Sequence, residues 1–144
     1  MEDTLVIDRV GVGRQAVRPP LGFTLLELIV AVVVVAILAS IAYPTYVNQV
    51  IKANRAAAQQ FLLDVANAEA QYQLDARAFS ATIGAGGLNL SVPNSVSPNY
   101  TIAVALTAGP PPGYVITATP IGRQAQDGAL TLDGTGNKTP ANKW

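Results

Sequence analysis

The sequence predicts an α+β protein in which one long N-terminal α-helix packs on a small antiparallel β-sheet. Three observations carry this prediction. An apolar stretch fills residues 23–43, a helical pattern without glycine or proline continues from Thr45 to Ala81, and short alternating runs between turn residues follow. The 144 residues suffice for one small domain beyond the apolar stretch.

Residues 1–22 are expected to be a leader peptide rather than a packed element. They hold three basic and three acidic residues, the adjacent prolines Pro19 and Pro20, and several glycines. Nine basic and nine acidic residues cancel over the whole chain, and they still cancel when this stretch is removed. This balance gives no reason to expect a strongly charged partner.

Residues 23–43 are predicted to form a transmembrane helix. Their only charge is Glu27, and 21 helical residues would span about 30 Å, the thickness of the bilayer hydrocarbon. The β-branched run inside this stretch would also suit a buried strand. A lone strand cannot satisfy its backbone in lipid, so the helix is preferred.

Residues 44–75 are predicted to be the amphipathic second half of the same helix. Pro44 removes one helical hydrogen bond and is expected to kink the helix without ending it. Beyond it, positions that recur at steps of three and four define one face. They are Val47, Val50, Ile51, Asn54, Ala58, Phe61, Leu62, Val65, Ala68 and Tyr72.

Residues 76–144 are predicted to form the globular sheet region. Strands are expected over residues 100–106, 114–119 and 129–133, because these runs alternate and turn residues separate them. The connector at 108–113, Ala-Gly-Pro-Pro-Pro-Gly, makes the first two strands a hairpin candidate. An antiparallel sheet over the outer half of the helix follows.

The composition argues against enzyme chemistry and predicts no catalytic site, no cofactor and no metal site. The chain has no cysteine and no histidine, which excludes disulfides, thiol and imidazole catalysis, and the usual zinc sites. The carboxylates of the soluble part form no paired motif, and most are expected to be solvated. They are Asp64, Glu69, Asp75, Asp127 and Asp133.

Two weaker signals concern a metal site and a nucleic-acid site. Asp127 and Asp133 each precede glycine, but six extended residues separate them by about 20 Å, so turn residues are favoured over a shared calcium site. The basic residues form no stripe, and no nucleic-acid partner is predicted. They are Lys52, Arg55, Arg123, Lys138 and Lys143.

The most specific motif lies at the start of the apolar stretch. Residues 22–30 read Gly-Phe-Thr-Leu-Leu-Glu-Leu-Ile-Val, which resembles the processing site of type IV prepilins. The resemblance implies that prepilin peptidase cuts between Gly22 and Phe23 and methylates the new amino group of Phe23. It places Glu27 at the family's glutamate position and Pro44 at its kink proline, and it implies the type IV pilin fold with residues 23–43 in the filament core.

Elementary electrostatics gives Glu27 a task in such a filament. A carboxylate in a membrane segment costs about 2–3 kcal/mol, so it should have a partner. Cleavage would create an ammonium group on Phe23, and the same group of a neighbouring subunit could neutralise Glu27. The alternative is that Glu27 reaches the lipid headgroups, favoured by the N-terminal end of the helix dipole.

The resemblance implies a structural subunit of a type IV pilus, either major or minor. The C-terminal tail of this chain resembles that of PilE-like pilins, although Lys143 stands where those relatives have a cysteine beside the terminal tryptophan. The implied partners are other pilin subunits, prepilin peptidase and the inner-membrane assembly machinery. The implied locations are the inner membrane, as a single-pass precursor, and then the extracellular filament.

Three alternatives stay open at this point. The chain could be a pseudopilin of a type II secretion system, or a single-pass membrane-anchored binding domain that never polymerises. An ordinary secretory signal is the third, because small residues from Ala36 to Ala42 could admit a general signal peptidase.

Overall fold

The structure, a computed structural model, describes residues 22–144 and has the predicted fold class. Helix α1 (Leu25–Ala76) is followed by strands β1 (Tyr100–Thr107) and β2 (Gly113–Pro120), the 3-10 helix η1 (Gly122–Asp127), β3 (Leu130–Asp133), β4 (Lys138–Thr139) and the 3-10 helix η2 (Ala141–Lys143). A long apolar helix that packs on a small antiparallel sheet is confirmed. The predicted leader, residues 1–22, lies outside the described residues except for Gly22.

The described residues divide into two units, one that ends at Ala39 and one that spans Ser40–Trp144. In the first unit, the described helical residues are all exposed. Helix α1 is long and apolar enough to cross a membrane, and no residue of its most apolar stretch is buried. Apolar side chains left in this state need lipid or another protein chain around them.

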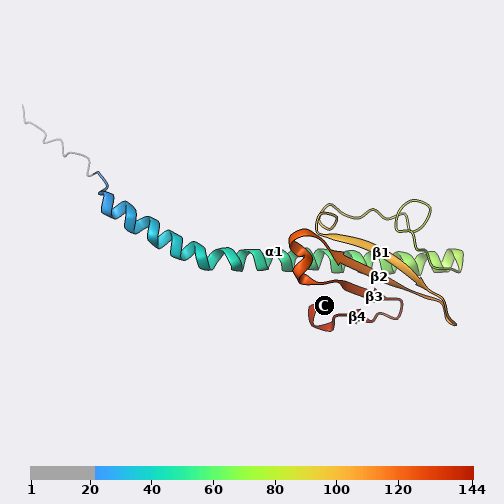
Figure 1. The fold of residues 1–144 in the computed structure, drawn as a ribbon. Coiled ribbons are helices and arrows are strands. Elements are labelled where there is room, and N and C mark those ends of the chain that lie inside the picture. Colours follow the sequence, from blue (N-terminus) through green and yellow to red (C-terminus); the bar gives the residue numbers. More distant parts are fainter. Residues whose placement is uncertain (1–21) are drawn as a thin grey trace, which may run out of the picture. The chain divides into compact units, whose positions relative to one another are not determined.

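In the second unit, one face of α1 packs on the sheet, whose strands run along this part of the helix in Figure 1. The buried helix residues are Ala58, Phe61, Leu62, Val65 and Glu69. Their spacing of three and four residues places them on one stripe, which explains why this segment folds as an amphipathic helix. Val50, which the sequence placed on the same face, is 40% exposed.

The sheet is antiparallel throughout, with strand order β1-β2-β3-β4. The β1–β2 register runs from Tyr100 opposite Pro120 to Thr107 opposite Gly113, which confirms the predicted hairpin. Strands β1, β2 and β3 lie within one residue of their predicted bounds at each end, whereas the two-residue β4 was not predicted. The side chains that the sheet buries against α1 are Tyr100, Val104, Tyr114, Ile116, Ala118, Leu130 and Leu132.

A long loop, residues 77–99, connects α1 to β1 and adds Leu88 and Val96 to the core. It is fastened to the helix through Glu69, whose Oε2 accepts a hydrogen bond of 3.0 Å from the backbone N–H of Ser80. Glu69 is fully buried and its Oε1 has no partner among the described residues. Burial raises the pKa of Glu69, and the hydrogen bond from Ser80 only partly opposes this rise.

Candidate functional site

The processing motif lies at the start of α1. Gly22 is exposed, Phe23 is 83% exposed, and both precede the first helical residue. Thr24 caps the helix: its Oγ1 accepts the N–H of Glu27 at 3.1 Å, and its carbonyl accepts the N–H of Leu28 at 3.2 Å. Thr24 and Glu27 therefore have the sequence spacing of a capping box, and the Gly22–Phe23 bond lies just outside the helix.

Glu27 occupies the first turn of α1 and is exposed. The unpaired N–H groups at a helix N-terminus favour a carboxylate there. A single subunit therefore presents one apolar helix with one negative charge near its beginning.

Pro44 lies inside α1, and helical structure continues on both sides of it. The hydroxyl of Thr45, the next residue, donates to the carbonyl of Ile41 at 3.1 Å. Such a bond from a helical threonine often accompanies a bend, and it is compatible with a kink at Pro44. The kink itself stays a prediction.

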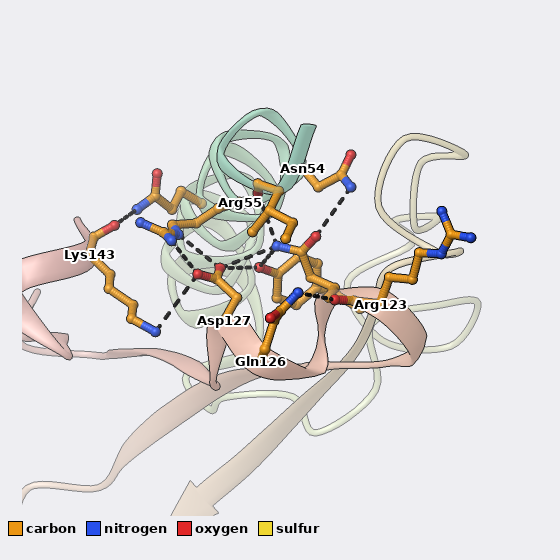
Figure 2. Close-up of polar contacts among 10 residues, drawn as sticks. Asn54, Arg55, Arg123, Gln126, Asp127 and Lys143 are labelled. Atoms are coloured by element: carbon orange, nitrogen blue, oxygen red, sulfur yellow. Dashed lines mark hydrogen bonds and ion pairs between the residues drawn. The ribbon is translucent and has the colours of Figure 1, made fainter. Parts of the chain in front are cut away.

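A second group of polar side chains joins α1 to the C-terminal part of the chain. We call it the Asp127 cluster, and Figure 2 shows its side chains converging between α1 and η1. Its members are Asn54, Arg55, Tyr100, Gln124, Asp127 and Lys143. The cluster brings together residues up to 89 positions apart in the sequence, from Asn54 to Lys143.

Asp127 is the centre of this cluster and is 5% exposed. Arg55 binds its carboxylate with two nitrogens, donating from Nε to Oδ2 at 2.8 Å and from the terminal guanidinium to Oδ1. The hydroxyl of Tyr100 donates to Oδ2 at 2.9 Å. A forked guanidinium on a carboxylate gives both energy and a fixed geometry.

Gln124 satisfies the remaining polar groups around the carboxylate. Its Nε2 donates to the carbonyl of Ile51 at 3.0 Å and to the hydroxyl of Tyr100 at 2.9 Å, and its Oε1 accepts from Asn54 at 3.2 Å. These contacts tie η1 directly to the backbone and side chains of α1. A buried polar network of this kind stabilises a fold when its members are paired.

The environment shifts the ionisation of the cluster in consistent directions. Burial alone would raise the pKa of Asp127, but the hydrogen bonds from Arg55 and Tyr100 outweigh it and the pKa is lowered. Burial, together with the hydrogen bond to Asp127, raises the pKa of Tyr100 to about 12. Asp127 is therefore ionised and Tyr100 protonated at neutral pH.

The C-terminal residues are held by the same region. The Nζ of Lys143 lies 3.8 Å from Oδ1 of Asp127, and the carbonyl of Lys143 accepts a hydrogen bond of 2.5 Å from Gln59 on α1. The indole N–H of Trp144 donates to the carbonyl of Thr139 at 3.2 Å. The Nζ of Lys138 lies 4.8 Å from the centroid of the Trp144 ring. Non-covalent contacts thus hold this cysteine-free C-terminal segment in place.

Sequence reasoning did not find this cluster. The expectation of solvated charges holds for Asp64 and Asp75, which are exposed, and is wrong for Glu69 and Asp127, which are buried. The sequence predicts Arg55 to be one of the solvated basic residues that form no stripe, although its spacing of one helical turn from Ile51 and Gln59 places it beside the packed face. That proximity was the available signal.

Asp133 behaves as the predicted turn residue. The hydroxyl of Thr135 donates to Oδ1 of Asp133 at 2.6 Å, and the N–H groups of Thr135 and Asn137 donate to the same oxygen, each at 2.9 Å. These bonds, that of the hydroxyl first, lower the pKa of Asp133. Asp127 is engaged by Arg55, so the two carboxylates have separate partners within the fold. Residues 22–144 contain no group of three potential metal-ligating acids.

Comparison with known proteins matches both halves of this description. The prokaryotic N-terminal methylation motif matches residues 20–43. A family model described as type IV minor pilin ComP, DNA uptake sequence receptor, matches residues 44–132, more than half of the chain. The chain belongs to this family of type IV minor pilins. Its members are structural pilus subunits, as the sequence predicted.

A curated relative supports the same assignment of this minor pilin. The fimbrial protein EcpC of Eikenella corrodens is 30% identical over 120 residues, covering 81% of this chain and 75% of the relative. The family favours the pilin interpretation over the pseudopilin and the anchored binding domain. Membership implies prepilin processing, membrane anchoring and assembly with other pilin subunits.

Proposed function

We propose that this minor pilin is held in the inner membrane as a single-pass precursor, is cut between Gly22 and Phe23, and then enters the pilus. The observation that carries the proposal is the capped motif at the start of α1, where every described residue up to Ala39 is exposed. Prepilin peptidase removes residues 1–22 and methylates Phe23. The inner-membrane assembly machinery then moves the subunit from lipid into the filament, where neighbouring helices cover the same apolar surface.

Glu27 provides the register between subunits in this proposal. Its carboxylate pairs with the Phe23 ammonium of a neighbour, which neutralises both charges in an apolar filament core. The cap at Thr24 fixes the first turn of the helix, so the carboxylate projects from a defined position. The domain limits proposed for this function are 1–22, 23–43, 44–75 and 76–144.

The intact mass and N-terminal sequence of the protein in filaments sheared from the source cells test the proposal. We expect a chain that begins at N-methylated Phe23, present at a small fraction of the filament. The variant Glu27→Gln should be cut normally in membranes and fall at least tenfold in filaments. A filament chain that begins at Met1, or after Ala42, contradicts the processing step. Normal incorporation of Glu27→Gln contradicts the ion pair.

DNA is a second candidate partner, because the matching family model is described as a DNA uptake sequence receptor. The sequence predicted no nucleic-acid partner. The described surface leaves Lys52, Arg77, Arg123 and Lys138 exposed, while Arg55 and Lys143 are engaged with Asp127. Titration of the mature protein with duplex DNA at two salt concentrations decides between these readings, since phosphate contacts give strong salt dependence.

A further inference from the structure

A mixed apolar and basic surface lies where α1 leaves the predicted membrane span. Tyr43, Tyr46 and Val50 follow one another at steps of three and four residues and are 66%, 70% and 40% exposed. Tyr46 and Val50 line a hollow of about 150 Å³ together with Asn99 and Arg123. We call Tyr43, Tyr46, Val50, Ile121 and Arg123 the juxtamembrane face.

Ile121 and Arg123 bring the sheet region into this surface. The N–H of Ile121 donates to the carbonyl of Asn99 at 2.9 Å, and its side chain is 40% exposed. The guanidinium of Arg123 points away from the Asp127 cluster in Figure 2. Among residues 22–144, no carboxylate forms an ion pair with Arg123.

We infer that the juxtamembrane face rests on the surface of the membrane before assembly, with Arg123 paired to the phosphate of an anionic phospholipid. Two features select lipid as the occupant. The face begins at the residue that ends the apolar stretch, and tyrosines are enriched where a helix passes from hydrocarbon into headgroups. Among the described residues that line the hollow, Arg123 alone carries a charge at neutral pH, so the site complements a negative group beside apolar surface.

As a consequence, the sheet region of the stored subunit has a fixed orientation relative to the membrane surface. Exposed isoleucine and valine would sit at the headgroup boundary, and the arginine would hold the sheet region there by charge. This inference rests on the proposed storage in the membrane. It adds the surface that contacts the lipid and the lipid class that it selects.

Single-cysteine labelling of the full chain tests the contact, because the sequence has no cysteine of its own. Ile121→Cys would carry a polarity-sensitive fluorophore in nanodiscs of phosphatidylglycerol and phosphatidylcholine, or of phosphatidylcholine alone. The control is Leu106→Cys, which is similarly exposed at 49% and lies at the far end of β1. We expect a blue-shifted emission at position 121 in the anionic nanodiscs, and a water-like emission at position 106.

Charge is tested in the Ile121→Cys background. Arg123→Gln should lower the ratio of docked to undocked protein about fivefold, the effect of one basic residue at an anionic surface, and 0.5 M salt should do the same. Arg77→Gln, which removes an exposed cation on the loop after α1, should leave the ratio unchanged.

The outcomes separate the two proposals. Failure of the chain to co-purify with nanodiscs contradicts membrane storage itself. Insertion with equal emission at positions 121 and 106 overturns the lipid contact alone, and equal shifts in both lipid mixtures overturn the anionic selectivity. A shift at position 121 that arises only when other pilin subunits are present would assign the face to a neighbouring subunit instead.

Discussion

Replacing Asp127 with asparagine should destabilise the sheet region by about 3 kcal/mol, at the lower end of the range for breaking a buried ion pair. The variant keeps the shape of the side chain and leaves Arg55 without its counter-charge. The Arg55 side chain is 21% exposed, so water can reach the guanidinium and moderates the loss. Asparagine also retains one oxygen as an acceptor for Tyr100.

Urea unfolding of the full chain in detergent measures this loss through Trp144, the single tryptophan, which follows Lys143 of the cluster in the sequence. With a slope of about 2 kcal/mol per molar urea, the midpoint should fall by about 1.5 M. Asp64→Asn is the matched control, since Asp64 is exposed and bonds only the side chain of Gln60. Its midpoint should move by less than about 0.3 M.

The same comparison has a defined pH dependence. The pKa of Asp127 is lowered from 3.8 in the fold, so the stability it contributes is present above pH 3.8 and is lost as the pH falls below it. Wild type and Asp127→Asn should therefore converge in acid. Equal midpoints for Asp127→Asn and Asp64→Asn at pH 7 would refute the structural role of the cluster.

Three further substitutions test other contacts. The pKa of buried Glu69 is raised from 4.5, so the stability that Glu69 contributes to the fold is lost as the pH rises. The variant Glu69→Gln should therefore gain stability relative to wild type between pH 4 and pH 7. Parallel curves of unfolding free energy against pH for the two proteins would argue against this. Leu62→Ala should cost about 3 kcal/mol by urea unfolding because Leu62 is 0% exposed, while Leu74→Ala, at 83% exposure, should cost little. Gly87→Ala places a Cβ 2.1 Å from a loop carbonyl and should speed hydrogen exchange in the loop, whereas Gly84→Ala, with open space around it, should not.

The regular elements were predictable because each follows a local rule. The helix was found from its apolar length and the three-and-four spacing, and three strands were found from alternation and intervening turn residues. Strand β4 escaped because a two-residue strand has no period of its own; it exists because Thr131 and Leu132 pair with Thr139 and Lys138. The processing motif was found because its residues are contiguous.

The Asp127 cluster could not be predicted in the same way. Arg55 and Asp127 are 72 residues apart, and only the completed sheet brings them together. Glu69 was missed for a different reason. It lies four residues after Val65 on the buried stripe. A charged residue at such a position is expected to face solvent, because the sequence does not show that the backbone N–H of Ser80 donates a hydrogen bond to it.

Because the C-terminal segment is attached by non-covalent contacts, folding of this subunit does not depend on thiol oxidation. Because Asp127, Arg55, Lys143 and Gln59 supply the connection, the domain needs no oxidase and no disulfide isomerase to reach its final fold. Dithiothreitol should leave its urea midpoint unchanged. Strains that lack periplasmic oxidants should still accumulate the folded subunit, even where disulfide-bonded pilus components fail to mature.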